Sequence, residues 1–254
     1  MKKILLIIPL VFLSQLYSRA QQFIDEAVIE YEVVSNIQKT MGNNTWAEML
    51  KENLPKFKTG YFTYTFSGNK SIYKFDHWAP QKIPKYMLTT DEESSWYYDF
   101  ENDQLNMKKL LYGSEFTLQQ PIYPLKWKLT NENRVIAGFN CRKAVTTIFD
   151  SVYVFAFYTD EILISGGPCS VHGLPGMILG MTIPRLYTSW IATKVMVNNV
   201  NKSQINPITA TKYFTKNEIE STLEERMKDW YSDDPADNAE IQQQKARMVW
   251  LTLL

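Results

Sequence analysis

The chain has 254 residues with 27 basic and 27 acidic side chains, so its formal net charge at pH 7 is zero. Without its first twenty residues, which hold three basic and no acidic side chains, 24 basic side chains face 27 acidic ones. A nucleic-acid partner would require a basic patch to neutralise phosphates, so this balance argues against one.

The first twenty residues have the pattern of a signal peptide. Two lysines precede an apolar run at 4–13, and a polar stretch then ends in the sequence Ser-Arg-Ala at Ala20. This layout is typical of exported bacterial proteins. The run is too short to span a bilayer, and no later run reaches eighteen apolar residues. We therefore predict cleavage after Ala20 and a periplasmic or secreted product that is not an integral membrane protein.

Most of the remaining chain predicts β-strands, because apolar and polar residues alternate in short runs. Residues 60–76 predict a hairpin whose turn lies at 67–69. The strand-like runs are 27–34, 61–66, 71–75, 95–100, 104–111, 127–130, 134–149, 152–159, 177–183 and 186–197. Short polar turns join them, without the helices that parallel βαβ units require. We predict a mainly β fold, formed by a single curved antiparallel sheet or open half-barrel.

Helices are predicted at 44–54 and in the C-terminal segment 215–250. Thr215 and Glu218 match a capping box, and apolar residues follow it at helical spacing. A second helix is expected from 236 to about 250. We expect both C-terminal helices to pack against the sheet. Residues 21–254 would then form a single domain.

Familiar catalytic signatures are missing, so no catalytic residue is assigned. Asp76 and His77 are neighbours in a predicted strand, where neighbouring side chains point to opposite faces, so we expect them to be poorly placed to act together. The acidic residues 91–93 are expected to form a solvated turn. A hydrolase would require these groups to meet in a cleft.

The two cysteines, Cys141 and Cys169, permit three interpretations. A disulfide would close a loop of 29 residues and stabilise the fold by about 3.6 kcal/mol in the chain-entropy model. A soft-metal site would use Cys169, His172, Met177 and Met181, a set of thiolate, imidazole and thioether ligands that suits copper as Cu(I). Two unpaired thiols are the third interpretation. The exported compartment favours the disulfide.

The stretch around His172 also has a backbone explanation. Gly173 and Gly176 can adopt positive φ without steric cost, and Pro175 favours an extended residue before it. The sequence GLPG therefore predicts a rigid bend leading into a strand. Gly180 within that strand indicates a bulge or a close backbone approach.

The sequence HGLPGMILGM (172–181) resembles the signature of the GLPGLI family, with Met177 in place of the leucine. The motif residues are Gly173, Leu174, Pro175, Gly176, Met177 and Ile178. Two segments before the motif also look like family segments: WKLTNENRVIAGFNCRKAVTTIF and VFAFYTDEILISGGP. The resemblance implies an exported protein of Gram-negative bacteria, with a β-rich fold similar to the bowl-like domain attached to a peptide-N-glycanase. It implies accessory roles in cell-envelope systems and no established catalytic residues.

We therefore expect a non-enzymatic binding or accessory protein of the cell envelope, without a cofactor. Its partner would be an envelope protein or a small ligand, held by the concave sheet face or the GLPG turn. A periplasmic copper-binding protein is one alternative. The other is an envelope hydrolase or the accessory domain of one.

Overall fold

The computed structural model describes residues 23–42, 45–111, 113–198, 200–231 and 234–254. The predicted signal peptide and its cleavage site lie outside the described residues. Among the helices in these ranges, none is both long and apolar enough to cross a membrane.

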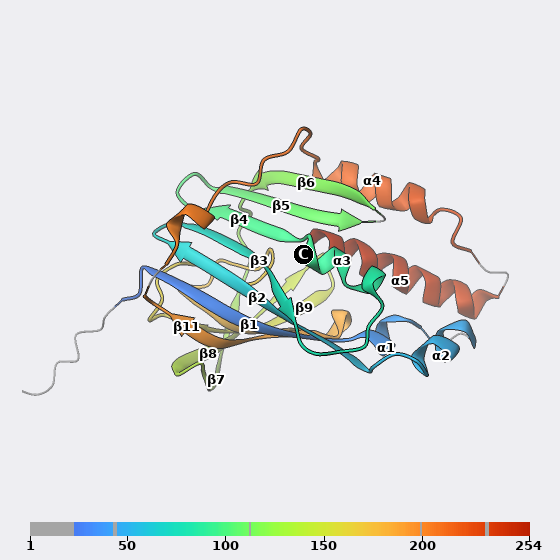
Figure 1. The fold of residues 1–254 in the computed structure, drawn as a ribbon, viewed down its shortest axis with the longest axis horizontal. Coiled ribbons are helices and arrows are strands. Elements are labelled where there is room, and N and C mark those ends of the chain that lie inside the picture. Colours follow the sequence, from blue (N-terminus) through green and yellow to red (C-terminus); the bar gives the residue numbers. More distant parts are fainter. Residues whose placement is uncertain (1–22, 43–44, 112, 199, 232–233) are drawn as a thin grey trace, which may run out of the picture.

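Eleven strands form one open sheet in which every neighbouring pair is antiparallel (Figure 1). The strand order is β6-β5-β4-β3-β2-β1-β11-β10-β9-β8-β7. The predicted mainly β fold with an unclosed antiparallel sheet is confirmed. The strands are β1 (Glu26–Asn36), β2 (Phe57–Ser67), β3 (Lys70–Trp78), β4 (Ser95–Asp99), β5 (Gln104–Leu111), β6 (Ser114–Pro121), β7 (Lys128–Ile136), β8 (Phe139–Ile148), β9 (Val152–Thr159), β10 (Met177–Ile183) and β11 (Thr188–Met196).

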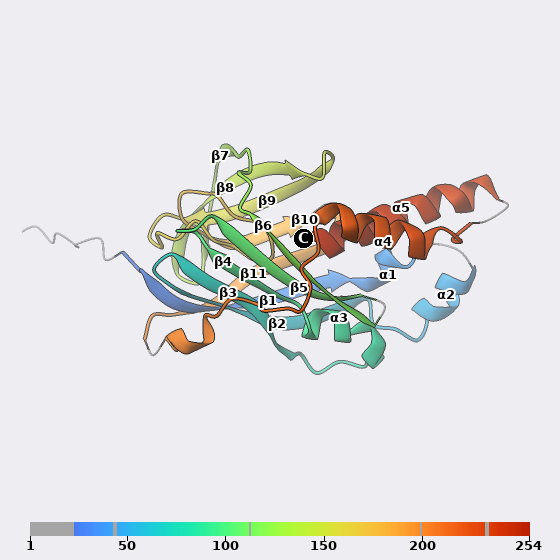
Figure 2. The ribbon, with the colours of Figure 1, turned by 90° about the horizontal axis from the view of Figure 1, so that it is seen from above.

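The strand order consists of two meanders, β1 to β6 and β7 to β11, joined by the pairing of β1 with β11. The two edge strands, β6 and β7, are therefore consecutive in the chain. Residues 122–127, which we call the crossing segment, must run from one edge of the curved sheet to the other. The curvature is clearest from above (Figure 2).

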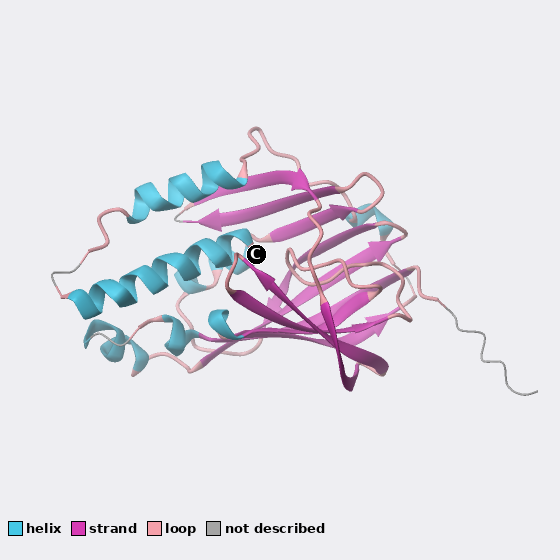
Figure 3. Cartoon of the chain, turned by 180° about the vertical axis from the view of Figure 1, so that it is seen from behind, coloured by secondary structure: helices cyan, strands magenta, loops and turns pink. Residues whose placement is uncertain are grey.

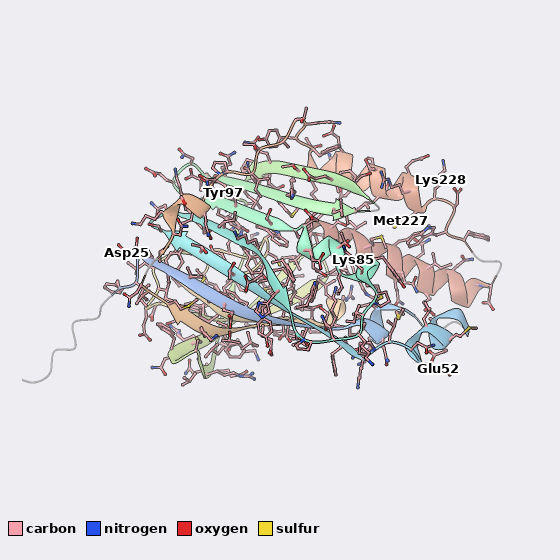
Figure 4. All side chains as sticks on the ribbon, viewed as in Figure 1. Asp25, Glu52, Lys85, Tyr97, Met227 and Lys228 are labelled. Carbon is pink, nitrogen blue, oxygen red and sulfur yellow. The ribbon has the colours of Figure 1, made fainter. Side chains whose placement is uncertain are left out.

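The helices gather at one end of the molecule, the end that carries Glu52 and Lys228, whereas Asp25 lies at the opposite end (Figure 4). The α-helices are α1 (Ile37–Thr40), α2 (Thr45–Lys51), α3 (Thr89–Glu92), α4 (Lys216–Met227) and α5 (Pro235–Leu253). The 3-10 turns are η1 (Lys85–Met87), η2 (Pro184–Leu186) and η3 (Lys202–Gln204), and η3 lies at the opposite end, where Lys202 pairs with Glu26. The capping box is confirmed, because Thr215 Oγ1 accepts from Glu218 N at 3.2 Å and Glu218 Oε2 accepts from Thr215 N at 2.7 Å.

Several elements differ from the sequence prediction. The short helices α1 and α3 were not predicted, and α3 includes Asp91 and Glu92, which were expected in a turn. Strand β6 was not predicted, because its polar residues interrupt the apolar pattern around Phe116 and Leu118. The run 134–149 is two strands, since Ala137 and Gly138 take φ of 50° and 88° and form a turn. The helix expected at 44–54 is described from Thr45 and ends at Lys51.

The concave side of the sheet is filled. The end of α5, marked C, lies inside the curve (Figure 3). Residues 160–176, here called the GLPG loop, contact this end and β4. Tyr98 Oη donates to the Cys169 carbonyl at 2.9 Å, and Trp96 Nε1 donates to the Leu254 carbonyl at 2.9 Å. The Ser170 amide donates to the same Leu254 oxygen at 2.6 Å. Buried aromatic side chains of this kind supply much of the apolar area that stabilises a core.

Candidate functional site

A cavity of about 940 Å³ remains on the open side of the sheet. It lies beside the crossing segment, between the β6 edge and the turn from β8 to β9. Ser170 and His172 of the GLPG loop, the start of α4 and Leu253 of α5 also line it. The full lining is Leu105, Leu118, Gln119, Gln120, Pro121, Tyr123, Leu125, Thr147, Ile148, Phe149, Asp150, Ser170, His172, Thr215, Lys216, Asn217 and Leu253.

The lining combines neutral hydrogen-bonding groups with apolar surface. Gln119, Gln120 and Asn217 bring amides, and several residues bring hydroxyls. Leucine and aromatic side chains supply the apolar part, and Asp150 and Lys216 carry opposite charges. Sites for organic ligands typically have this mixture of apolar walls and a few polar groups.

His172 connects the GLPG loop to the crossing segment. Trp127 Nε1 donates to the His172 carbonyl at 2.9 Å, while the His172 ring nitrogens face the carbonyls of Tyr123 (Nε2, 3.1 Å) and Ser170 (Nδ1, 3.0 Å). A neutral imidazole can donate to only one of these two carbonyls. Burial lowers the pKa of His172, and the two carbonyls oppose that shift. The residue therefore has a structural role that the sequence did not indicate.

The glycines of the GLPG loop have the predicted conformations. Gly173 has φ of +87° and Gly176 has φ of +136°. A Cβ at Gly176 would lie 2.0 Å from the carbonyl oxygen of Thr159, so this position also requires a close backbone approach. Gly180 lies at the expected bulge, since the register with β9 shifts beside it. A Cβ there would lie 2.7 Å from the side-chain atom Ile136 Cδ1, so the close neighbour is a side chain and not backbone.

The predicted disulfide is not formed, because Cys141 and Cys169 are both free and buried in the structure. The two thiols have different neighbours: Cys141 lies near Phe139 and Tyr31, whereas Cys169 lies near Trp190. Burial raises the pKa of Cys141 to about 11 and that of Cys169 to about 12. Neither thiol has the lowered pKa of a reactive cysteine.

The residues considered for copper are all buried. Met177 and Met181 are almost fully buried on β10. Both ring nitrogens of His172 face backbone carbonyls, so neither is directed at Cys169. Within the described ranges, no three His, Cys, Asp or Glu residues form a metal-binding group. Copper binding would require one ring nitrogen of His172 to leave its carbonyl, and it stays a prediction.

The expectation that Asp76 and His77 face apart is wrong. Their side chains hydrogen-bond, with 2.8 Å between His77 Nδ1 and Asp76 Oδ2. The register shift between Tyr61 and Phe62 leaves Asp76 as an extra residue in β3. Such a bulge breaks strict alternation and re-aims side chains. The His77 ring stacks on Tyr61 at 4.6 Å between centroids.

The acidic residues 91–93 do not join this pair. Asp91 pairs with Lys58, Glu92 Oε1 accepts from Trp78 Nε1 at 2.8 Å, and Glu93 pairs with Lys108 at 3.4 Å. A shallow cavity of about 390 Å³ beside His77 is lined by Glu30, Tyr61, His77, Trp78, Ala79, Pro80 and Lys194. These lining residues include no serine or cysteine nucleophile.

Sequence reasoning missed most of the cavity lining. Gln119, Gln120 and Tyr123 belong to an edge strand and a crossing segment that become significant only when the sheet order is known. Their one sequence signal is Pro121, where the alternating pattern ends and an irregular stretch begins. Within a sheet, proline is confined to edge positions, so it indicates that this strand lies at an edge.

Comparisons with known proteins give partial matches. No family model matches the sequence, and no curated protein matches it. Among solved structures, one crystal form of PNGF-II is 14% identical with a TM-score of 0.48 and covers 75% of this chain and 31% of that one. A second crystal form of PNGF-II is 13% identical with a TM-score of 0.49, and the match covers 86% of this chain and 33% of the PNGF-II chain. The chain thus spans about a third of the PNGF-II chain.

An uncharacterized conserved protein from Thermus thermophilus is 7% identical, with a TM-score of 0.37 over 74% of this chain and 90% of that one. None of the three TM-scores reaches 0.5. The function therefore has to be inferred from the chain's own residues.

Proposed function

We propose that this protein is a non-enzymatic binding protein that holds a small organic ligand in the cavity beside the crossing segment. One observation carries the proposal: the GLPG loop and α5 fill the rest of the concave side, while about 940 Å³ stays open at the sheet edge. Of the two surfaces expected to bind, the sheet contributes residues of β5, β6 and β8 to this cavity, and the GLPG loop contributes Ser170 and His172. Volumes of roughly 300–1,000 Å³ are typical of ligand sites.

The lining favours a neutral or zwitterionic ligand with amide or hydroxyl groups and one apolar face. Side-chain amides can both donate and accept hydrogen bonds. Phe149 and Leu118 provide apolar contact, and the opposed charges of Asp150 and Lys216 disfavour a ligand with a large net charge of either sign. Because both ring nitrogens of His172 face backbone carbonyls rather than the open cavity, binding is favoured over acid-base catalysis.

The proposal can be tested with a panel of short peptides and neutral oligosaccharides, using the thermal midpoint of unfolding as the readout. At least one class should raise the midpoint, because a ligand that binds only the folded state stabilises it. Asn217→Trp should abolish the effect by filling the cavity. Asn140→Trp, at an exposed position of β8, is the matched control and should leave it intact. Equal effects in both variants, or no effect of any compound on the wild type, would contradict the proposal.

Export to the cell envelope and membership of the GLPGLI family are parts of the same proposal. They are supported by the residue pattern at 1–20 and by the motif at 172–181. Expression in a Gram-negative host should yield an exported product whose intact mass begins at Gln21. A cytoplasmic product that retains Met1 would count against export.

A hydrolase is the second candidate, and the Asp76–His77 hydrogen bond is the observation that favours it. A carboxylate that orients a histidine is one part of many hydrolytic sites. Activity towards p-nitrophenyl esters that is lost in both His77→Gln and Asp76→Asn would establish this candidate. Activity unchanged in His77→Gln would remove it.

A further inference from the structure

A second cavity, of about 460 Å³, lies between α1, α2 and α5 at the helical end of the molecule. We call it the basic cavity. The residues that line it differ from those beside the crossing segment. Its volume also falls within the roughly 300–1,000 Å³ of ligand sites. Any ligand of the basic cavity would therefore bind independently of the proposed function.

Positive charge is concentrated in this cavity. Lys39, Lys51, Lys56 and Arg247 line it together with one carboxylate, that of Glu240. The whole chain has equal numbers of basic and acidic side chains, so this excess is local. Charges of one sign in a concave site raise the local concentration of oppositely charged ligands.

Two of these cations have no ion pair in the part of the chain that the structure describes. The Lys39 ammonium lies 5.5 Å from the ring centre of Tyr187, and the Lys56 ammonium lies 5.4 Å from that of Phe57. Lys51 differs, because it pairs with Glu48 at 2.6 Å. Lys39 and Lys56 can therefore accept an anionic ligand without breaking an existing pair.

Arg247 provides a donor that lacks an acceptor. Its Nη1 donates to the Thr40 carbonyl at 3.0 Å, which ties α5 to α1. Its Nε is buried and has no hydrogen-bond partner among the described residues. An unpaired buried donor is costly and uncommon in folded proteins. The Arg247 guanidinium, which lines the cavity, adds a fixed positive charge to its wall.

Tyr187 holds a strained position beside these cations. Its φ of 52° and ψ of 33° place it in the left-handed region, which is uncommon for residues other than glycine. The Asn36 amide donates to its carbonyl at 2.9 Å, and its ring lies within 5.5 Å of both Lys39 and Arg247. Strained residues often occur at ligand clamps.

We propose that the basic cavity binds a phosphate or sulfate group. Lys39 and Lys56 supply compact positive charges, and Arg247 adds a fixed positive charge to the cavity wall. Arginine and lysine together are well suited to oxyanions that carry two negative charges. The volume leaves room for an organic part, so the group can belong to free phosphate or to a phosphorylated sugar.

The test is calorimetric titration of the full mature chain with inorganic phosphate, inorganic sulfate, glucose 6-phosphate and acetate. The doubly charged oxyanions should bind and acetate should not. The double variant Lys39→Gln, Lys56→Gln keeps the chain length near each position and should weaken binding about tenfold or more. Lys128→Gln, an exposed lysine on β7, is the matched control and should bind as the wild type does.

Each outcome bears directly on the proposal. Tighter binding of glucose 6-phosphate than of phosphate would identify a phosphorylated organic ligand, and equal binding would show that the oxyanion alone is recognised. Absence of binding by all the doubly charged anions would overturn the proposal. The same conclusion follows if acetate binds equally well, or if the double variant binds like Lys128→Gln. The effect of Asn217→Trp on stabilisation by peptides or sugars tests the other cavity alone, because Asn217 does not line the basic cavity. Failure of one proposal can therefore be distinguished from failure of the other.

Discussion

The hydroxyl of Tyr98 donates a 2.9 Å hydrogen bond to the carbonyl oxygen of Cys169, joining β4 to the GLPG loop. Both residues are buried. The sheet is therefore not an empty bowl, because its own chain occupies the concave side. This contact limits ligand access to the rim of the sheet, where the open cavity lies.

Tyr98→Phe should lower the free energy of unfolding by about 1–3 kcal/mol, because it leaves the buried Cys169 carbonyl without this donor. Urea denaturation at neutral pH would measure the change. Tyr153→Phe, at an exposed position of β9, is a control that should change stability by less than about 0.5 kcal/mol. Equal stability of Tyr98→Phe and the wild type would show that water replaces the lost donor.

Gly176→Ala should be among the most destabilising single changes in the GLPG loop, at roughly 3 kcal/mol or more. The new Cβ would lie 2.0 Å from the Thr159 carbonyl oxygen, at a φ of +136°. Gly173→Ala is the matched comparison, because it also has positive φ but its nearest neighbour is 3.8 Å away. It should cost only about 1–2 kcal/mol. Similar thermal midpoints for the two variants would show that backbone strain alone, and not the close approach, decides both effects.

Local chemistry predicted some features of this chain well. The alternation of apolar and polar residues predicted most strands. The absence of a Cβ atom at Gly173, Gly176 and Gly180 predicted their backbone roles. Both properties depend only on a residue and its immediate neighbours in the sequence. The capping box between Thr215 and Glu218 is local in the same way.

Features that depend on distant contacts could not be predicted. The pairing of β1 with β11 determines which strands are edges, and hence where the cavity lies. The Asp76–His77 contact arises from a bulge opposite Tyr61, which alternation cannot show. The pairing of Cys141 with Cys169 was inferred from compartment and loop entropy, neither of which fixes the distance between two side chains.

The purified native protein should contain two free thiols, and reduction should leave its intact mass unchanged. Both thiols should react slowly with a thiol reagent until denaturant is added, because burial raises their pKa values to about 11 and about 12. The thiolate fraction at neutral pH is then lower by about a hundredfold or more than in an exposed cysteine. A mass increase of two hydrogens on reduction would instead show that a disulfide forms.

His172 should make stability fall as the pH falls below the ordinary histidine pKa of 6.5. Burial lowers its pKa in the folded state, so the unfolded chain takes up a proton before the folded chain does. The unfolded state then binds more protons, and the free energy of unfolding decreases with decreasing pH. This contribution to stability is fully present above pH 6.5 and is lost as the pH falls towards the lowered pKa of His172 in the folded state.

The comparison should use His172→Gln, which retains a side-chain donor but does not titrate in this range. Urea denaturation between about pH 7.5 and about pH 5 should show that the wild type loses more stability on acidification than this variant does. Asn140→Gln, at an exposed and non-titrating position of β8, is the control and should follow the wild-type pH dependence. A constant stability difference between the wild type and His172→Gln at all pH values would contradict the prediction, since the folded and unfolded states would then bind this proton equally.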